Sequence, residues 1–137
     1  MRIYLDSCIV IYIVEGPESL QDLVESALTD IYEDEDFVEL CVSPLVRLEC
    51  RVAPIRDGDQ SLLADLDEFF ASEGVVSLPI SEPTFDVATT LRAENRLKTP
   101  DALHLAVALD NECDELWTND DRFARAATGT MQIRCLV

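Results

Sequence analysis

Hydrophobic positions along the chain follow two spacings that alternate. Short runs rich in branched residues predict strands at residues 2–6, 40–43, 75–80, 115–120 and 131–137. Between them, apolar residues recur every three or four positions, which predicts helices at residues 7–16, 19–32, 43–54, 61–72, 81–97, 99–112 and 121–127. Strands that alternate with helices indicate an α/β fold with a central, mainly parallel β-sheet flanked by α-helices.

Several of these helices carry start signals. The pairs Ser43–Pro44 and Thr99–Pro100 place a capping hydroxyl next to a proline, and residues 81–83 repeat this signal. Ser7 would cap the first helix in the same way. Residues 34–39 are dominated by acids, and clustered like charge opposes compaction, so we expect a solvated loop there.

Length and hydropathy predict one domain, residues 1–137. The chain has 137 residues, of which 48% are hydrophobic, which is enough for one core but too little for two ordinary domains. No apolar run approaches the roughly 20 residues that cross a bilayer, and Asp6 interrupts the apolar start. We therefore expect a cytoplasmic protein with no membrane association.

The charge is strongly negative. Twenty-eight acidic residues against ten basic ones give a formal net charge of −18, and Lys98 is the only lysine. Such a surface repels nucleic acid at long range, so binding a polynucleotide would need a local positive patch, a metal ion or high salt. The charge serves either ordinary solubility or life in a salty cytosol, and a melting temperature that rises between low and molar KCl would favour the second.

The cysteines and the histidine argue against a structural zinc site. The five cysteines are odd in number and irregularly spaced, so we expect reduced, mostly buried thiols. A zinc centre needs clustered Cys and His, and His104 is the only histidine. Because His104 lies between Leu103 and Leu105, we expect a packed, hydrogen-bonded core residue rather than a general base.

Three acidic residues lie where predicted elements begin or end, and a fourth lies inside a predicted helix. Asp6 ends the first strand, Asp120 follows the strand at 115–118, Glu49 lies in the helix after the second strand, and Asp101 opens a helix directly behind Pro100. In an open parallel sheet these positions face one edge. Converged carboxylates repel one another, and a hard cation such as Mg²⁺ or Mn²⁺ removes that conflict and favours phosphodiester hydrolysis.

Each of these acids also has an ordinary structural explanation. Asp6 and Asp101 would stabilise helix starts, and Asp120 would belong to a turn. Glu49 would pair with Arg47 or Arg51 on the surface of its helix. Spacing alone leaves both explanations open.

At these residues the sequence resembles PIN domains, specifically the VapC-type toxins of type II toxin–antitoxin systems. The likeness lies in four stretches that occur in the right order: "IYLDSCIVIYIVE", "SPLVRLEC", "LKTPDALHLAVAL" and "LWTNDDRF". The resemblance implies a PIN-like fold, a Mg²⁺- or Mn²⁺-dependent endoribonuclease that hydrolyses RNA phosphodiester bonds, a cognate antitoxin protein that blocks the site, and a homodimer.

The resemblance also assigns roles to the site residues. Asp6 and Asp101 match the metal ligands best, and Glu49 and Asp120 complete the acidic quartet, with Asp121 as the alternative fourth acid. Two hydroxyl residues match supporting positions that orient carboxylates or water, and these are Ser7 and Thr118. Cys8 departs from the asparagine that many relatives carry there, which puts one supporting hydrogen bond in doubt.

The RNA backbone would need positive charge close to the acids. Arg92, Arg96 and Lys98 stand just ahead of Asp101 and are the best candidates, although pairing with Glu94 on the helix surface would explain them equally well. The large aromatic side chains suggest core or interface positions rather than a base-stacking platform, and these are Trp117, Phe69 and Phe70.

Two other functions compete with the ribonuclease interpretation of the sequence. A catalytically weak PIN-like module that binds RNA or protein would keep the fold without cleavage. A phosphoacceptor receiver domain would also be a small acidic α/β protein, but it needs a lysine at a late strand end, and Lys98 precedes a helix instead. Cleavage that depends on a divalent cation separates the enzyme from the binding module.

Overall fold

The strands form a single parallel sheet of five strands, in the order β3-β2-β1-β4-β5. The computed structural model describes residues 1–126 and 129–136. Within them the order of elements is β1 (Arg2–Leu5), α1 (Ser7–Glu15), α2 (Glu18–Asp34), β2 (Glu39–Val42), α3 (Pro44–Asp57), α4 (Gln60–Ala71), β3 (Val75–Ser77), α5 (Glu82–Asn95), α6 (Thr99–Asp110), β4 (Glu115–Thr118), the short 3₁₀ helix η1 (Asp121–Arg125) and β5 (Gln132–Cys135). The predicted parallel α/β fold is confirmed.

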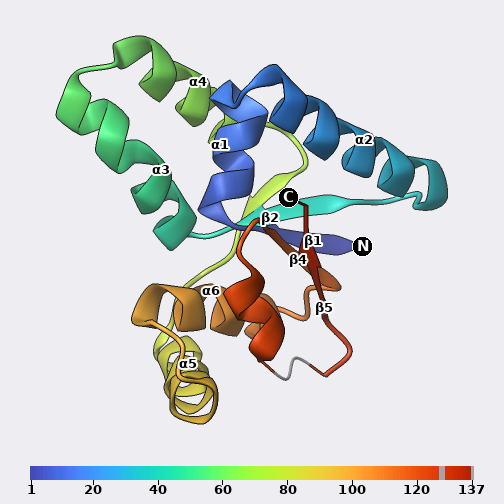
Figure 1. Ribbon diagram of the computed structural model, residues 1–137, viewed down its shortest axis with the longest axis vertical. Coiled ribbons are helices and arrows are strands. Elements are labelled where there is room, and N and C mark those ends of the chain that lie inside the picture. Colours follow the sequence, from blue (N-terminus) through green and yellow to red (C-terminus); the bar gives the residue numbers. More distant parts are fainter. Residues whose placement is uncertain (127–128, 137) are drawn as a thin grey trace.

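The helices lie on both sides of this sheet. In Figure 1, α1, α2, α3 and α4 lie on one side of the strands, and α5, α6 and η1 lie on the other. The first strand occupies the middle of the sheet and pairs in parallel with both β2 and β4. The carboxyl end of β1 is therefore flanked by the carboxyl ends of its two neighbours, although β4 comes more than a hundred residues later.

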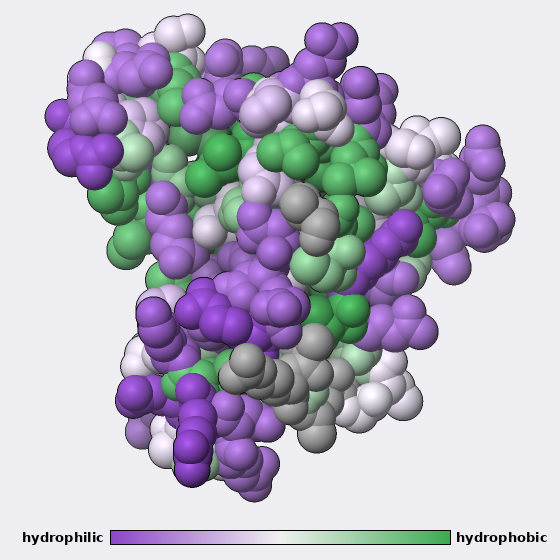
Figure 2. Space-filling view, viewed as in Figure 1, coloured by the Kyte–Doolittle hydropathy of each residue, from purple (hydrophilic) through white to green (hydrophobic). Residues whose placement is uncertain are grey.

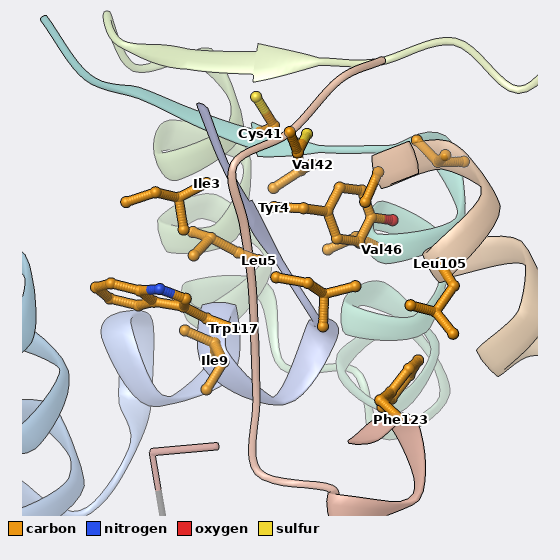
Figure 3. Packing of buried hydrophobic residues seen from close by; sticks show 14 of the residues in the cluster. Ile3, Tyr4, Leu5, Ile9, Cys41, Val42, Val46, Leu105, Trp117 and Phe123 are labelled. Atoms are coloured by element: carbon orange, nitrogen blue, oxygen red, sulfur yellow. The ribbon is translucent and has the colours of Figure 1, made fainter. Parts of the chain in front are cut away.

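The core follows from the alternation of side chains along these strands. Ile3 and Tyr4 are both fully buried, but neighbouring strand residues face opposite sides of the sheet. Figure 3 shows Ile3, Ile9 and Trp117 gathered on one side of β1, and Tyr4 on the side of Leu105. Since both faces are covered by helices, the buried positions of the three central strands are apolar on both faces except for Thr118 at the end of β4, as is typical of parallel sheets.

The surface is mostly hydrophilic, as the net charge of −18 requires. In Figure 2, polar residues cover most of the visible face, and hydrophobic residues gather over the region of α1 and α2. The helices of the described residues include none that is long and apolar enough to cross a membrane.

Several element boundaries differ from those that the sequence pattern predicted. The helix expected to stop at Pro54 continues to Asp57, and Gly58 ends it in the left-handed conformation with φ of 70°. Proline removes only one backbone hydrogen bond, and the side chain of Pro54 is buried, so packing favours the extra turn. The first helix is capped by the side chain of Asp6 and not by that of Ser7.

Other differences are shorter or shifted elements. The strand predicted at 75–80 spans only Val75–Ser77, and the helix predicted at 121–127 is a 3₁₀ helix that ends at Arg125, with residue 127 outside the described part. The last strand covers Gln132–Cys135, and residue 137 also lies outside the described part. The acidic loop is shorter than expected, because α2 continues to Asp34.

We expect Leu116→Ala in β4 to lower the free energy of unfolding by about 2–5 kcal/mol, because it removes a fully buried side chain and leaves a cavity. Urea unfolding at constant salt measures the change. Leu23→Ala in α2 is the matched control, since its side chain is 40% exposed and its loss should cost much less. Equal losses for the two variants would contradict the placement of the core at β4.

Candidate active site

Asp6 lies at the centre of the candidate site, where β1 ends and α1 begins. The backbone N–H of Ser7 donates to Asp6 Oδ1 at 2.7 Å, and the hydroxyl of Thr118 donates to Asp6 Oδ2 at 2.8 Å. The residue is only 8% exposed. Groups on two different elements, α1 and β4, therefore hold one carboxylate oxygen each.

Glu49 and His104 lie beside Asp6. His104 Nε2 is 2.5 Å from Glu49 Oε1 and 3.7 Å from Asp6 Oδ1. The candidate ligand atoms of these three residues all lie within 4.8 Å of one another. The structure thus brings together side chains from α3, α6 and the end of β1.

The surface pairing that could have explained Glu49 is not formed. Arg51 Nε lies 3.2 Å from Asp67 Oδ1 on α4, and Arg47 NH2 lies 3.9 Å from the same oxygen. Both arginines therefore point toward α4, whereas Glu49 faces the site.

His104 is buried and hydrogen-bonded, as expected, but its environment is polar on one side. The residue is 2% exposed, and its Nδ1 lies 2.8 Å from the hydroxyl of Tyr4. The leucines next to His104 in the sequence give no sign of these polar contacts, because they point to other parts of the helix surface. The sequence pattern predicts a core position for His104, but it does not reveal that the ring faces two acids.

Asp101 occupies the first turn of α6, where its side chain is 15% exposed. Burial raises the pKa of this carboxyl, the positive charge of Arg122 opposes the rise, and the charges of Asp120 and Asp6 add to it. Asp101 thus lies in the field of the other acids. It is not among the three residues whose ligand atoms lie within 4.8 Å of one another.

Asp120 follows β4 and caps η1. Its carboxylate accepts hydrogen bonds from the backbone N–H of Arg122 at 2.9 Å and from Arg122 Nε at 2.7 Å. The hydrogen bond from the Arg122 side chain holds the pKa of Asp120 below its usual value. The neighbouring Asp121 is exposed to solvent, so the geometry favours Asp120 as the fourth acid.

Arg122 is the site residue that the sequence analysis did not identify. Its guanidinium is hydrogen-bonded to Asp120, and NH2 also lies 3.8 Å from Asp101 Oδ2. The signal was present in the stretch "NDDR", where a basic residue stands two positions after a candidate acid. Arg122 is the counter-charge shared by Asp101 and Asp120.

The side chains at the supporting positions contact the carboxylate of Asp6 at different distances. Thr118 Oγ1 donates to Asp6 and accepts from the backbone N–H of Asp120 at 3.0 Å, so it links the two acids. The hydroxyl of Ser7 is 3.5 Å from Asp6 Oδ1, and Cys8 Sγ is 3.6 Å from Asp6 Oδ2. Burial and the charge of Asp6 raise the pKa of Cys8 to about 12, so it remains a neutral thiol and a weak donor.

The basic residues predicted near Asp101 divide into two groups. Arg96 and Lys98 line a small pocket of about 90 Å³ together with Asp101 and Arg122. Arg92 instead donates from Nε to the carbonyl of Leu97 at 3.0 Å, and it lines an adjoining groove of about 570 Å³ beside α5 and α6, which Arg96 lines as well. Arg92 is therefore not among the residues of the small pocket.

The donor set fits a hard divalent cation. Asp6 and Glu49 supply carboxylate oxygens, and the side chain of Glu49 is 31% exposed, which leaves it reachable from solvent. Mg²⁺ binds oxygen at about 2.0–2.1 Å, so ligands on opposite sides of the ion lie about 4.2 Å apart. A spread of 4.8 Å needs only a small adjustment to match this geometry.

Comparison with known proteins identifies a family. The family model of the PIN domain matches residues 3–129. No curated protein matches the sequence significantly.

Solved structures share the fold. VapBC2 from Rickettsia felis, bound to a DNA fragment from its promoter, matches with a TM-score of 0.73 and 18% identity over 98% of both chains. A toxin–antitoxin complex from Klebsiella pneumoniae matches at 0.63 and 23%, over 87% of each chain. VapC20 from Mycobacterium tuberculosis, a toxin that cleaves the sarcin–ricin loop, matches at 0.68 and 12%, over 89% of this chain and 92% of that one.

We expect Arg122→Ala to lower the melting temperature of the metal-free protein, because Asp101 and Asp120 lose their shared counter-charge. Added Mg²⁺ should restore much of the loss, and calorimetric melting with and without Mg²⁺ measures both effects. The control is Arg56→Ala, whose exposed pair with Asp57 should contribute almost nothing. An Arg122→Ala protein that melts like the wild type without metal would show that the pairing is not stabilising.

Proposed function

Because this chain belongs to the PIN-domain family, we propose that it is a Mg²⁺- or Mn²⁺-dependent endoribonuclease and the toxin of a type II toxin–antitoxin system. The observation that carries the proposal is the convergence of Asp6 and Glu49, with Asp101 nearby, at the carboxyl edge of the sheet. Ligands of open α/β sheets bind at this edge. The solved neighbours that are toxins or toxin–antitoxin complexes support the biological role.

The acids have distinct tasks in this proposal. Asp6 and Asp101 hold the cation, and Glu49 and Asp120 complete the acidic shell. Thr118 and Ser7 keep the carboxylate of Asp6 in one orientation through their hydrogen bonds. A bound Mg²⁺ or Mn²⁺ supplies Lewis acidity, which activates water and neutralises charge on the phosphodiester during hydrolysis.

A protein with a net charge of −18 needs local positive charge to approach RNA. Arg96 and Lys98 line the small pocket next to Asp101, and they are the residues that we assign to the RNA backbone. Arg92 is the weakest of the predicted backbone contacts, because its Nε is already hydrogen-bonded to the carbonyl of Leu97. The RNA footprint should therefore be small and strongly dependent on salt.

The proposal includes partners and location. As a toxin the protein would work in the cytoplasm and bind a cognate antitoxin that covers the site. We also propose a homodimer, because α3 exposes an apolar stripe in which Leu48 is 59%, Val52 51% and Ile55 56% exposed.

Purified protein should cleave an RNA pool in the presence of Mg²⁺ or Mn²⁺, and EDTA should abolish this cleavage. Asp101→Asn should reduce cleavage at least about a hundredfold, since it removes a charge from the cation site while keeping the shape. Gel electrophoresis of the RNA products measures the rate.

The matched control is Asp121→Asn, which changes an exposed acid in the same region and should leave cleavage nearly normal. Asp120→Asn should resemble Asp101→Asn if Asp120 is the fourth acid. If the wild type cuts no RNA in any metal or salt, the proposed ribonuclease is wrong, and a PIN-like binding module becomes the better explanation.

Light scattering should give the wild type about twice the mass of a 15.3 kDa chain. Val52→Glu should reduce this to the mass of one chain, because it places a charge in the middle of the α3 stripe. Phe37→Glu is the control, since Phe37 is 69% exposed but lies before β2 and not on α3. A wild-type monomer at micromolar concentration would contradict the proposed homodimer.

A further inference from the structure

A buried line of hydrogen bonds leads from the start of α3 to Glu49 through His104. Ser43 Oγ is 2.8 Å from the hydroxyl of Tyr4, and that hydroxyl is 2.8 Å from His104 Nδ1. On the other side of the ring, Nε2 is 2.5 Å from Glu49 Oε1. Ser43, Tyr4 and His104 are each at most 2% exposed. We call these four residues the hydrogen-bond relay.

One direction of the relay lets every hydroxyl hydrogen in it find an acceptor. The backbone N–H of Val46 can only donate, and it donates to Ser43 Oγ at 3.4 Å. The hydroxyl hydrogen of Ser43 is then available for Tyr4, and the hydroxyl hydrogen of Tyr4 for His104 Nδ1. Burial raises the pKa of Tyr4 far above its usual value, so its phenol keeps this hydrogen.

The opposite direction satisfies fewer groups. If Nδ1 donated to Tyr4 and Tyr4 donated to Ser43, the hydroxyl hydrogen of Ser43 would point away from both of its partners in the described part of the chain. A buried hydroxyl without an acceptor is costly. In the neutral ring with its hydrogen on Nδ1, the lone pair of Nε2 would also face the carboxylate of Glu49 at 2.5 Å. The unsatisfied hydroxyl of Ser43 and the contact between the Nε2 lone pair and the Glu49 carboxylate therefore both disfavour this direction.

We propose that His104 is a positioning residue: the relay orients its ring with a hydrogen on Nε2, and this N–H holds Glu49 next to Asp6 for the cation. The part that concerns the cation rests on the proposed function. His104 is then not a metal ligand, although its Nε2 lies within 4.8 Å of the oxygens of both acids, because a nitrogen that carries hydrogen has no lone pair to donate.

The proposal explains how Glu49 is kept in place. Its side chain is 31% exposed and has several rotatable bonds, so without a partner it would sample many rotamers and turn away from the negative charge of Asp6. A single N–H donor from a buried ring fixes one carboxylate oxygen and leaves the other oxygen free. The site then offers oxygen ligands only, which suits Mg²⁺ and Mn²⁺ rather than Zn²⁺.

Because His104 is the only histidine, nuclear magnetic resonance of protein labelled with ¹⁵N in its histidine reports this ring alone. In the metal-free wild type we expect one tautomer, with hydrogen on Nε2 and none on Nδ1, and we expect the same state after Mg²⁺ is added. Tyr4→Phe should give a mixture of tautomers, because Nδ1 loses its donor. Tyr32→Phe is the matched control, since Tyr32 is 53% exposed and far from the relay.

Calorimetry with Mn²⁺ tests the positioning role separately from RNA cleavage. His104→Leu should weaken Mn²⁺ binding about 10- to 100-fold, and His104→Gln should recover part of the affinity, because its amide retains an N–H donor. Circular dichroism confirms that both variants are folded.

Several outcomes would overturn the proposal. These are a wild-type ring without hydrogen on Nε2, loss of that hydrogen when Mg²⁺ binds, a tautomer unchanged in Tyr4→Phe, no Mn²⁺ binding, or equal affinities for the Leu and Gln variants. A protein that binds Mn²⁺ with the expected tautomer but cuts no RNA contradicts only the proposed ribonuclease, so the two failures are distinguishable.

Discussion

Repulsion among carboxylates at one edge of the sheet is the constraint on which the arrangement of this site depends. The structure meets it in two different ways. The oxygens of Asp6 are held by hydrogen bonds from the Ser7 backbone and Thr118, and an oxygen of Glu49 is held by the ring of His104. Asp101 and Asp120 share the full positive charge of Arg122. The first pair is thus positioned by hydrogen bonds, while the charge of the second pair is partly neutralised by an arginine of the protein itself.

The sheet order determines which of these residues can meet. Since β1 lies between β2 and β4, Asp6 follows the central strand and Thr118 ends its neighbour, and the two are 112 positions apart. The same order places the start of α3 beside Tyr4, which connects Ser43 to His104. One buried tyrosine in the middle of the sheet thus links the packing of the core to the orientation of a side chain at its edge.

The sequence predicted the fold well because its strongest signals are local. Alternation of strand and helix spacing, together with caps such as Ser43–Pro44, depends on neighbouring residues and survives folding unchanged. Boundaries were less accurate at Pro54, where burial outweighs the usual effect of proline. The positions of Asp6, Asp101 and Asp120 at element ends were also local information, and the ligand roles of all four acids, including Glu49, stay a prediction.

The parts of the site that the sequence could not predict depend on contacts between distant elements. His104 stands in an apolar helix, and only the positions of Tyr4 and Glu49 reveal that both ring nitrogens have polar partners. Arg122 lies in a short 3₁₀ helix, a kind of element with no clear periodicity in a sequence. Its partner Asp101 is about twenty residues earlier, so the pairing appears only when α6 and the end of β4 are brought together.

Asp101 illustrates why a helix-start role and a cation-site role are compatible. The residue lies in the first turn of α6, where the helix dipole favours negative charge, yet burial raises the pKa of its carboxyl. The helix dipole and the contact with Arg122 therefore do not fully compensate the charged carboxylate of Asp101 for the water that it loses on burial. A cation that binds beside Asp101 would supply the missing stabilisation, because it favours the charged form directly. The same carboxylate can thus open the helix and still be incompletely stabilised as a charged group, which is compatible with the proposed cation site.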